Sequence, residues 1–363
     1  MSGPRIALDT TVAALDLAGT GRHIRSLEAA LRPILGERIV SIRSRFAAPH
    51  AGPRTPGDMV RTLVRDLWWH QTGVERAARR AGADILHLPA AAGPLRGRLP
   101  TVVTIHDLRV LHAPQEFRPW FRQYARVVIP RLARRAARVI TVSETTRRDV
   151  MEHLGLPEDR VVTVPNGVTI SGQPSALREY HLPPRYVLSV GTLEPRKNLI
   201  RLFEAVRLLA QRPATRDIVL VHAGGYGWLA QDIVRAARAP ALQGRVRLLG
   251  YVTEEDLAGL YRQAQLLAYP SLAEGFGLPV LEAMAAGCPV VTSDRSSLPE
   301  VAGGAAVLVE PECVEAIAEG IRHVWEDDVL AADLKARGRA RARLFSWERT
   351  ARLTADVYAS VLR

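Results

Sequence analysis

The sequence predicts an α/β protein of two domains, each a doubly wound parallel sheet covered by helices on both faces. Three observations support this. Short apolar runs alternate with longer amphipathic stretches along the whole chain, which is the βαβ rhythm of parallel sheets. The 363 residues exceed the roughly 100–200 residues of a single domain. A segment rich in Pro, Gly and Ser interrupts the rhythm at residues 165–185 and reads as a linker.

The first half begins with the apolar run RIALD at residues 5–9, which predicts a strand. A glycine-containing turn, Gly19-Thr20-Gly21, then leads into a helix at 22–35. The remaining apolar and amphipathic runs predict strands at 39–42, 85–88, 101–105 and 139–142, and helices at 60–81 and 118–137.

The second half repeats the pattern after the linker, and ends in a helix at 347–362 that follows a long arginine-rich helix. The apolar runs predict strands at 186–190, 218–223, 246–249, 266–269, 290–292 and 306–309. The amphipathic runs between them predict helices at 199–209, 230–238, 254–263, 280–286 and 314–325.

Composition indicates an ordinary globular protein with a basic surface. The chain is 47% hydrophobic and 24% charged, with a formal net charge of +12. Of its 49 basic residues, Lys197 and Lys335 are the two lysines. Three interpretations of the charge stay open: a solvated surface, attraction to an anionic membrane, and nucleic acid. The last is disfavoured, because the chain shows no nucleic-acid recognition motif and no aromatic–basic interleaving of the kind expected for nucleic-acid binding.

The chain is expected to be cytoplasmic. No apolar run reaches the ~20 residues that span a bilayer, and the first residues lack the apolar core of a signal peptide. Two cysteines, Cys288 and Cys313, make neither a disulfide framework nor a metal site. Peripheral contact with the inner membrane face remains the alternative location.

The run EGFGLPVLE places seven residues between Glu274 and Glu282, and is the strongest local signal. Pro279 suits the first position of a helix that Gly287 ends. Free N–H groups at that helix start favour the binding of a phosphate. A carboxylate one turn inside the helix can accept hydrogen bonds from both hydroxyls of a ribose. Together these features indicate a sugar-nucleotide site. The alternative is an ordinary αβ unit with two solvated acids.

A second signal is SVGTLEPRKNL at 189–199, where a buried strand ends at Gly191. Arg196 and Lys197 lie in the following loop, at a helix start, and so predict a diphosphate site. A lysine in a chain so rich in arginine suggests that a compact charge is required there. The alternative is a solvated helix start.

His106 follows the apolar strand TVVTI directly. Because ligands of doubly wound sheets bind beyond the carboxyl ends of strands, this position favours a functional histidine. The alternative is a histidine that only makes structural hydrogen bonds.

The chain resembles the large retaining glycosyltransferase family 4, of GT-B fold. The resemblance covers nearly the whole sequence. Its segments are GTGR at 19–22, IHDL at 105–108, VITVSE at 139–144, PNGV at 165–168, GTLEPRKNL at 191–199, GYV at 250–252, the run from Ser271 to Val291 and the tail SWERTARLTADVY.

The resemblance implies an acceptor-side domain at 1–170, a nucleotide-sugar domain at 171–345, and a C-terminal helix at 346–363 that crosses back to the first domain, with a cleft between the domains. Glu282 would hold the ribose, Glu274 would lie beside the transferred sugar, Arg196 and Lys197 would neutralise the diphosphate, and His106 would face the sugar. The other implied donor-binding residues are Gly21, Asn166, Gly191, Val252, Gly275, Phe276, Gly277 and Leu278.

Two positions depart from the family pattern. Thr192 stands where some members have an arginine, which leaves the diphosphate more dependent on Arg196 and Lys197. Thr169 stands where aspartate is frequent, which affects the contact near the linker but not the donor site.

The resemblance further implies transfer with retention of configuration, without a metal ion or other cofactor. The motif style is similar to mannosyltransferases of surface polysaccharide assembly, which use GDP-mannose and polyprenyl-linked or other glycan acceptors. Aromatic residues among arginines at 61–70 and 118–135 favour contact with an anionic membrane, with core packing as the alternative. Two other functions remain open: a sugar-nucleotide 2-epimerase on the same fold, and a non-catalytic basic peripheral scaffold.

Overall fold

The computed structural model describes residues 3–14, 19–45, 65–117, 119–169, 177–227 and 229–362. The chain forms two compact units. The N-terminal unit comprises Met1–Gly167 and Ser346–Arg363, and the C-terminal unit comprises Val168–Phe345. Both units have the predicted α/β architecture, so the predicted fold class is confirmed. No helix in the described ranges is both long and apolar enough to cross a bilayer.

The N-terminal unit is built on a six-stranded sheet of order β2-β1-β3-β4-β5-β6, in which every pairing is parallel. The edge strand β6 was not predicted, because three residues, two of them only half-buried, are too few for a clear apolar run. The strands are β1 Ile6–Asp9, β2 Ile39–Ile42, β3 Ile85–Leu88, β4 Thr101–Ile105, β5 Arg138–Thr141 and β6 Val161–Thr163.

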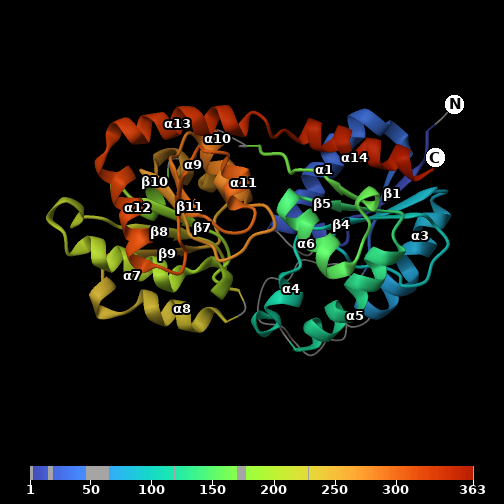
Figure 1. The fold of residues 1–363 in the computed structure, drawn as a ribbon, viewed down its shortest axis with the longest axis horizontal. Coiled ribbons are helices and arrows are strands. Elements are labelled where there is room, and N and C mark those ends of the chain that lie inside the picture. Colours follow the sequence, from blue (N-terminus) through green and yellow to red (C-terminus); the bar gives the residue numbers. More distant parts are fainter. Residues whose placement is uncertain are drawn as a thin grey trace. The chain divides into compact units, whose positions relative to one another are not determined.

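The helices of the N-terminal unit include one from the far end of the chain. Helix α14 lies beside α1 (Figure 1), and its Tyr358 hydroxyl bonds to His87 Nδ1 at 2.7 Å. Its apolar face shares a core cluster with Ile6 and Leu8 of strand β1. The helices are α1 Gly19–Leu35, α3 Val74–Arg80, α4 Arg109–His112, α5 Pro119–Arg135, α6 Glu144–Leu154 and α14 Trp347–Val361.

Two helix predictions in this unit need correction. The first helix begins at Gly19 rather than at residue 22. The single helix predicted at 60–81 is wrong for the described part: a π-helical segment, Arg65–Gly73, precedes α3. Trp69 and His70 are consecutive and both buried, and a widened turn lets neighbouring side chains face inward together. Residues 60–64 lie outside the described ranges.

The C-terminal unit has a second parallel sheet, of order β12-β11-β10-β7-β8-β9. Helix α7 packs Leu202, Phe203 and Val206 into its core. The strands are β7 Val187–Val190, β8 Leu220–Ala223, β9 Val246–Gly250, β10 Leu266–Tyr269, β11 Val290–Ser293 and β12 Val307–Val309. The helices are α7 Leu199–Ala210, α8 Ala230–Ala237, α9 Glu254–Gln263, α10 Leu278–Ala286, α11 Leu298–Ala302, α12 Val314–Glu326 and α13 Asp328–Ala342.

The strand order of this sheet creates one switch point. From β7 the chain proceeds to β8 and β9 on one side, and then returns to place β10 on the other side of β7. The loops that leave β7 and β10 therefore diverge at the carboxyl edge, which is where doubly wound sheets bind ligands. Lys197 follows β7 and Glu274 follows β10, so strand order brings the two strongest sequence motifs together.

Candidate active site

An ion-paired cluster occupies the switch point between β7 and β10. Lys197 Nζ lies 2.7 Å from Glu274 Oε1 and 2.6 Å from the Tyr269 hydroxyl. Tyr269, the last residue of β10, donates its hydroxyl proton to the same carboxylate oxygen at 2.7 Å. Arg196 pairs with the other oxygen of Glu274 and, at 2.7 Å, with Glu194. The structure thus brings together three of the predicted catalytic residues, Arg196, Lys197 and Glu274.

The cluster is buried, and this sets its electrostatics. Burial alone would raise the pKa of Glu274, but the charges of Arg196 and Lys197 outweigh it and hold that pKa at about 2. Burial, followed by the charge of Arg196, lowers the pKa of Lys197. Both pKa values are lowered, but the shift favours the charged form of Glu274 and disfavours that of Lys197, because the carboxylate gains from two cations whereas each cation also faces the other. Glu274 is therefore ionised at neutral pH.

Local backbone geometry positions the two cations. Asn198 adopts a left-handed conformation (φ 58°), which ends the short turn Pro195–Lys197 and begins α7. Its side-chain amide donates to the carbonyl oxygens of Pro270 at 3.0 Å and Pro311 at 2.6 Å. Gly191 has φ 134°, and a Cβ there would lie 3.1 Å from Lys197 Cε. The loop is thus fixed at both ends.

Helix α10 begins directly after the glutamate loop. Gly277, with φ 103°, precedes it, and Leu278 and Pro279 are its first two residues, so Pro279 is the second rather than the first helical residue. Ser297 Oγ donates to the carbonyl oxygens of Glu274 at 2.8 Å and Phe276 at 3.0 Å. These bonds shape the loop Gly275–Gly277 at the positive end of the α10 dipole.

Glu282 lies one turn inside α10, as predicted. Its side chain is buried, and Oε2 accepts a hydrogen bond from the Tyr261 hydroxyl at 2.9 Å. Tyr261 belongs to α9, so this bond fixes the carboxylate relative to a neighbouring helix. Val252 is half-buried in the loop between β9 and α9, and Tyr251 beside it is 63% exposed.

Two predicted residues of the N-terminal unit, His106 and Asn166, both contact the buried His23 of α1. Its Nδ1 lies 2.8 Å from Asn166 Oδ1, and its ring packs edge-on against His106 at 4.7 Å between centroids. His106 Nε2 donates to the Pro89 carbonyl oxygen at 2.9 Å, and burial lowers the pKa of His106. Gly21 lies two residues before His23 on the same helix. His106 and Asn166 therefore share one neighbour.

Sequence reasoning missed several of these partners. The sequence predicts Tyr269 only as the end of a strand and Tyr261 only as part of a helix, with no role in the site for either. His23 carried no motif of its own. Another missed group is Asp9, at the end of β1: it is 5% exposed, accepts a 2.5 Å bond from the Thr11 hydroxyl, and has its pKa raised by burial.

Comparison with known proteins agrees with the fold and the motifs. The family described as Glycosyl transferases group 1 matches residues 178–341, and Glycosyltransferase Family 4 matches residues 18–172. O-antigen chain mannosyltransferase B of Escherichia coli is 36% identical over 266 residues, 71% of this chain and 69% of the relative. Phosphatidyl-myo-inositol mannosyltransferase of Mycolicibacterium smegmatis is 32% identical over 77% of this chain and 68% of its own. The serotype-specific mannosyltransferase WbdA of Escherichia coli is 30% identical, and the match spans about a third (34%) of its length.

Solved structures show the same fold at lower identity. Sucrose-phosphate synthase from Thermosynechococcus elongatus superposes with a TM-score of 0.78 at 22% identity, covering 98% of both chains. Anabaena HepE in complex with UDP-glucose gives a TM-score of 0.74 at 19% identity, over 98% of this chain and 99% of that one. The fold and the motifs therefore define a glycosyltransferase with the GT-B fold. The chain belongs to glycosyltransferase family 4.

Proposed function

We propose that this glycosyltransferase moves mannose from GDP-mannose to a hydroxyl of a glycan or lipid-linked acceptor, with retention of configuration. The observation that carries the proposal is the cluster of Arg196, Lys197 and Glu274 beside the start of α10. The choice of mannose is supported by the mannosyltransferases among the relatives, two of which are 36% and 32% identical to this chain.

In this proposal the C-terminal unit binds the donor at the switch point. The diphosphate becomes a further partner of Arg196 and Lys197, beside Glu274, and N–H groups of the Gly275–Leu278 segment at the start of α10 complete its binding site. Glu282 accepts hydrogen bonds from the ribose hydroxyls. Backbone groups near Gly191 and Val252 bind the remainder of the nucleotide.

The chemistry assigned to the cluster is electrostatic. As the bond between the sugar and the diphosphate breaks, negative charge grows on the leaving phosphate, and fixed cations in a buried site stabilise it more than they stabilise the bound donor. Lys197 and Arg196 supply these charges, so the proposal assigns no metal ion or other cofactor to the step. Attack occurs on the face that the diphosphate leaves, and the leaving phosphate accepts the acceptor's proton.

Glu274 keeps its negative charge during this step. With a pKa near 2 it stays ionised at neutral pH, and so it can stabilise positive charge on the sugar ring and accept hydrogen bonds from sugar hydroxyls. For His106 we retain the role that the family implies, contact with the sugar and the reacting carbon, and for Asn166 a place among the donor-binding residues near the linker.

Donor identity is tested by incubating the protein with GDP-mannose, GDP-glucose, UDP-glucose and UDP-galactose, and following thermal stabilisation and slow donor hydrolysis. GDP-mannose should give the largest shift and the fastest hydrolysis, because a bound donor stabilises the folded state by mass action. Nuclear magnetic resonance of the first sugar product formed should show the donor's anomeric configuration. A preference for another donor would overturn the mannose assignment, and an inverted product would overturn retention.

We also propose that α5 contacts an anionic membrane surface on which a lipid-linked acceptor resides. Trp120 is 48% exposed and Val127 44% exposed on this helix, and Arg126 and Arg131 are exposed beside them. The parallel prediction for residues 61–70 falls partly outside the described ranges, although Trp68 is 43% exposed. Exposed apolar side chains among cations are typical of interfacial helices.

Sedimentation with liposomes tests this contact. Binding should require acidic lipid and weaken with salt, since exposed charges are screened over about 10 Å at 0.1 M. Replacing Arg126 and Arg131 by Gln should reduce sedimentation and leave donor hydrolysis unchanged. Equal sedimentation with neutral and acidic liposomes, or with neither at low salt, would contradict the proposal.

A further inference from the structure

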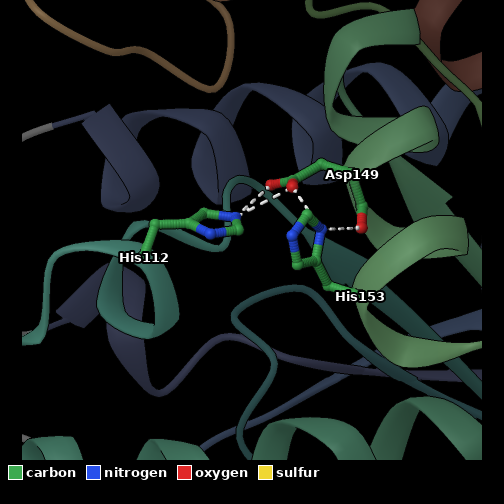
Figure 2. A group of neighbouring side chains, drawn as sticks. All are labelled: His112, Asp149 and His153. Atoms are coloured by element: carbon green, nitrogen blue, oxygen red, sulfur yellow. Dashed lines mark hydrogen bonds and ion pairs between the residues drawn. The ribbon is translucent and has the colours of Figure 1, made fainter.

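Three metal-ligating side chains, none of them among the predicted site residues, converge where α4 meets α6 in the N-terminal unit. His112 is the last residue of α4, and Asp149 and His153 are one helical turn apart on α6. Figure 2 shows both imidazole rings directed at the Asp149 carboxylate. His112 Nε2 lies 2.8 Å from Asp149 Oδ1, and His153 Nδ1 lies 2.9 Å from the same oxygen.

The spacing of these atoms suits a transition-metal ion. One ligand atom from each residue lies within 4.8 Å of the other two. In a tetrahedral zinc site with bonds of about 2.0–2.2 Å, ligand atoms are about 3.4 Å apart. The two His–Asp distances are slightly shorter than this, so an ion would enter by small side-chain rotations that open the cluster. Among the described residues, this is the one group of three or more such side chains close enough to hold a metal.

The ligand types and exposure narrow the choice of ion. Two imidazoles and one carboxylate suit zinc and its transition-metal neighbours, whereas magnesium and calcium prefer oxygen ligands alone. The three side chains are 36%, 26% and 44% exposed for His112, Asp149 and His153. Solvent therefore reaches the cluster, and water can complete the coordination. We propose that His112, Asp149 and His153 bind a divalent transition-metal ion, with zinc the first candidate.

Such an ion would fix the segment that follows His106. This segment runs from the end of β4 through α4 to His112. It is already tied to α6 at one point, because the Thr146 hydroxyl donates to the His106 carbonyl oxygen at 3.2 Å. A metal ion would add a second tie six residues later. His112 and His153 are thus positioning residues for the His106 loop, and metal binding here does not depend on the donor or the reaction.

Calorimetric titration of the untagged full chain with zinc chloride tests the site directly. The expected result is one ion per chain, with weak or undetectable binding of magnesium and calcium. Cobalt should give the visible absorption of a low-coordinate complex with imidazole ligands. His112→Ala, His153→Ala and Asp149→Asn should each weaken zinc at least about tenfold, since losing even an outer-shell partner costs about 10–100-fold in metal affinity.

His323→Ala is the matched control. His323 also faces an acidic residue four positions away, with Nε2 3.5 Å from Glu319 Oε1, and is 58% exposed, but it belongs to no three-residue group in the described part of the chain. This variant should bind zinc like the parent protein. If all four variants bind alike, zinc is bound by exposed histidines in general and the site is refuted. If one of the variants His112→Ala, His153→Ala and Asp149→Asn misfolds without metal, zinc binding by the other two tests the site.

Hydrogen exchange tests the positioning role. Zinc should slow amide exchange in residues 106–117 of the parent protein and of His323→Ala, but not of His153→Ala. Donor hydrolysis should continue in metal-free protein, because none of His112, Asp149 and His153 is assigned to the reaction. Unchanged exchange in this segment on saturation with zinc would overturn the positioning role.

Discussion

Glu274 offers the sharpest test of the buried cluster, through the substitution Glu274→Gln. The change keeps the shape of the side chain and removes the charge that faces Lys197 and Arg196. The side chain is 8% exposed, so solvent cannot replace the lost interaction. The carboxylate should therefore contribute to the stability of the C-terminal unit in a way that depends on pH.

The magnitude follows from the pKa of Glu274, which is about 2 instead of 4.5. The difference of about 2.5 pKa units, at about 1.36 kcal/mol each, corresponds to about 3.4 kcal/mol of unfolding free energy. Because the folded-state pKa is depressed, this contribution is fully present above pH 4.5 and is lost as the pH falls through about 2. Linkage then leaves about 3.2 kcal/mol at pH 5 and about 1.4 kcal/mol at pH 3.

Urea unfolding at pH 7, 5 and 3 measures this contribution, with the transitions of the two units fitted separately. The difference in unfolding free energy between the parent protein and Glu274→Gln should be nearly equal at pH 7 and pH 5, and about 2 kcal/mol smaller at pH 3. An exposed glutamate, Glu255, replaced in the same way, controls for the loss of one negative charge. A difference that is the same at all three pH values would refute the ion-paired state of Glu274.

Three further predictions concern the donor site and the backbone that supports it. Lys197→Ala should lower turnover about 100-fold, the scale of one lost transition-state donor, whereas Lys335→Ala should not; normal turnover with only a raised KM would contradict the role. Glu282→Ala should lose about 2–4 kcal/mol of donor binding by calorimetry, as expected for two charge-assisted bonds, and unchanged affinity would remove the ribose assignment. Gly224→Ala should cost about 1–3 kcal/mol in urea unfolding, because its Cβ would lie 1.8 Å from a strand-end carbonyl oxygen. Gly225→Ala, with open space around its Cβ, should cost much less, and equal costs would argue against the close approach.

Most of the fold was predictable because apolar runs and helix signals are local. Helix α6, Glu144–Leu154, was not assigned a range of its own, and the remaining elements that escaped were too short or too irregular for periodicity. Strand β6 has three residues, too few to show a clear alternation of apolar and polar residues. Helix α11 has five residues, fewer than two helical turns. The π-helical Arg65–Gly73 reads as part of a regular helix, because its widened turn depends on tertiary packing of Trp69 and His70.

The residues of the site were predictable from the sequence, but the contacts between them were not. Arg196, Lys197 and Glu274 each carried a local signal, yet their meeting depends on β10 lying beside β7. The order of strands within a sheet is not visible in one sequence. The pairing of Glu274 with both cations, and the tyrosine hydroxyls of Tyr269 and Tyr261, follow only from that order. The same holds for His112, whose partners lie on a helix more than 30 residues away.

The division of the N-terminal unit into residues 1–167 and 346–363 has a consequence for biosynthesis. The ribosome makes the whole C-terminal unit before it makes α14, so the C-terminal unit can fold while the N-terminal unit still lacks one of its helices. Until then the apolar surface that α14 covers, including Leu27 and Leu31 of α1, stays open to solvent. His87 also lacks its hydrogen bond to the Tyr358 hydroxyl until α14 is made. Nascent chains should therefore expose an aggregation-prone apolar surface on the N-terminal unit while the second sheet is synthesised. Chaperones would protect them during this period.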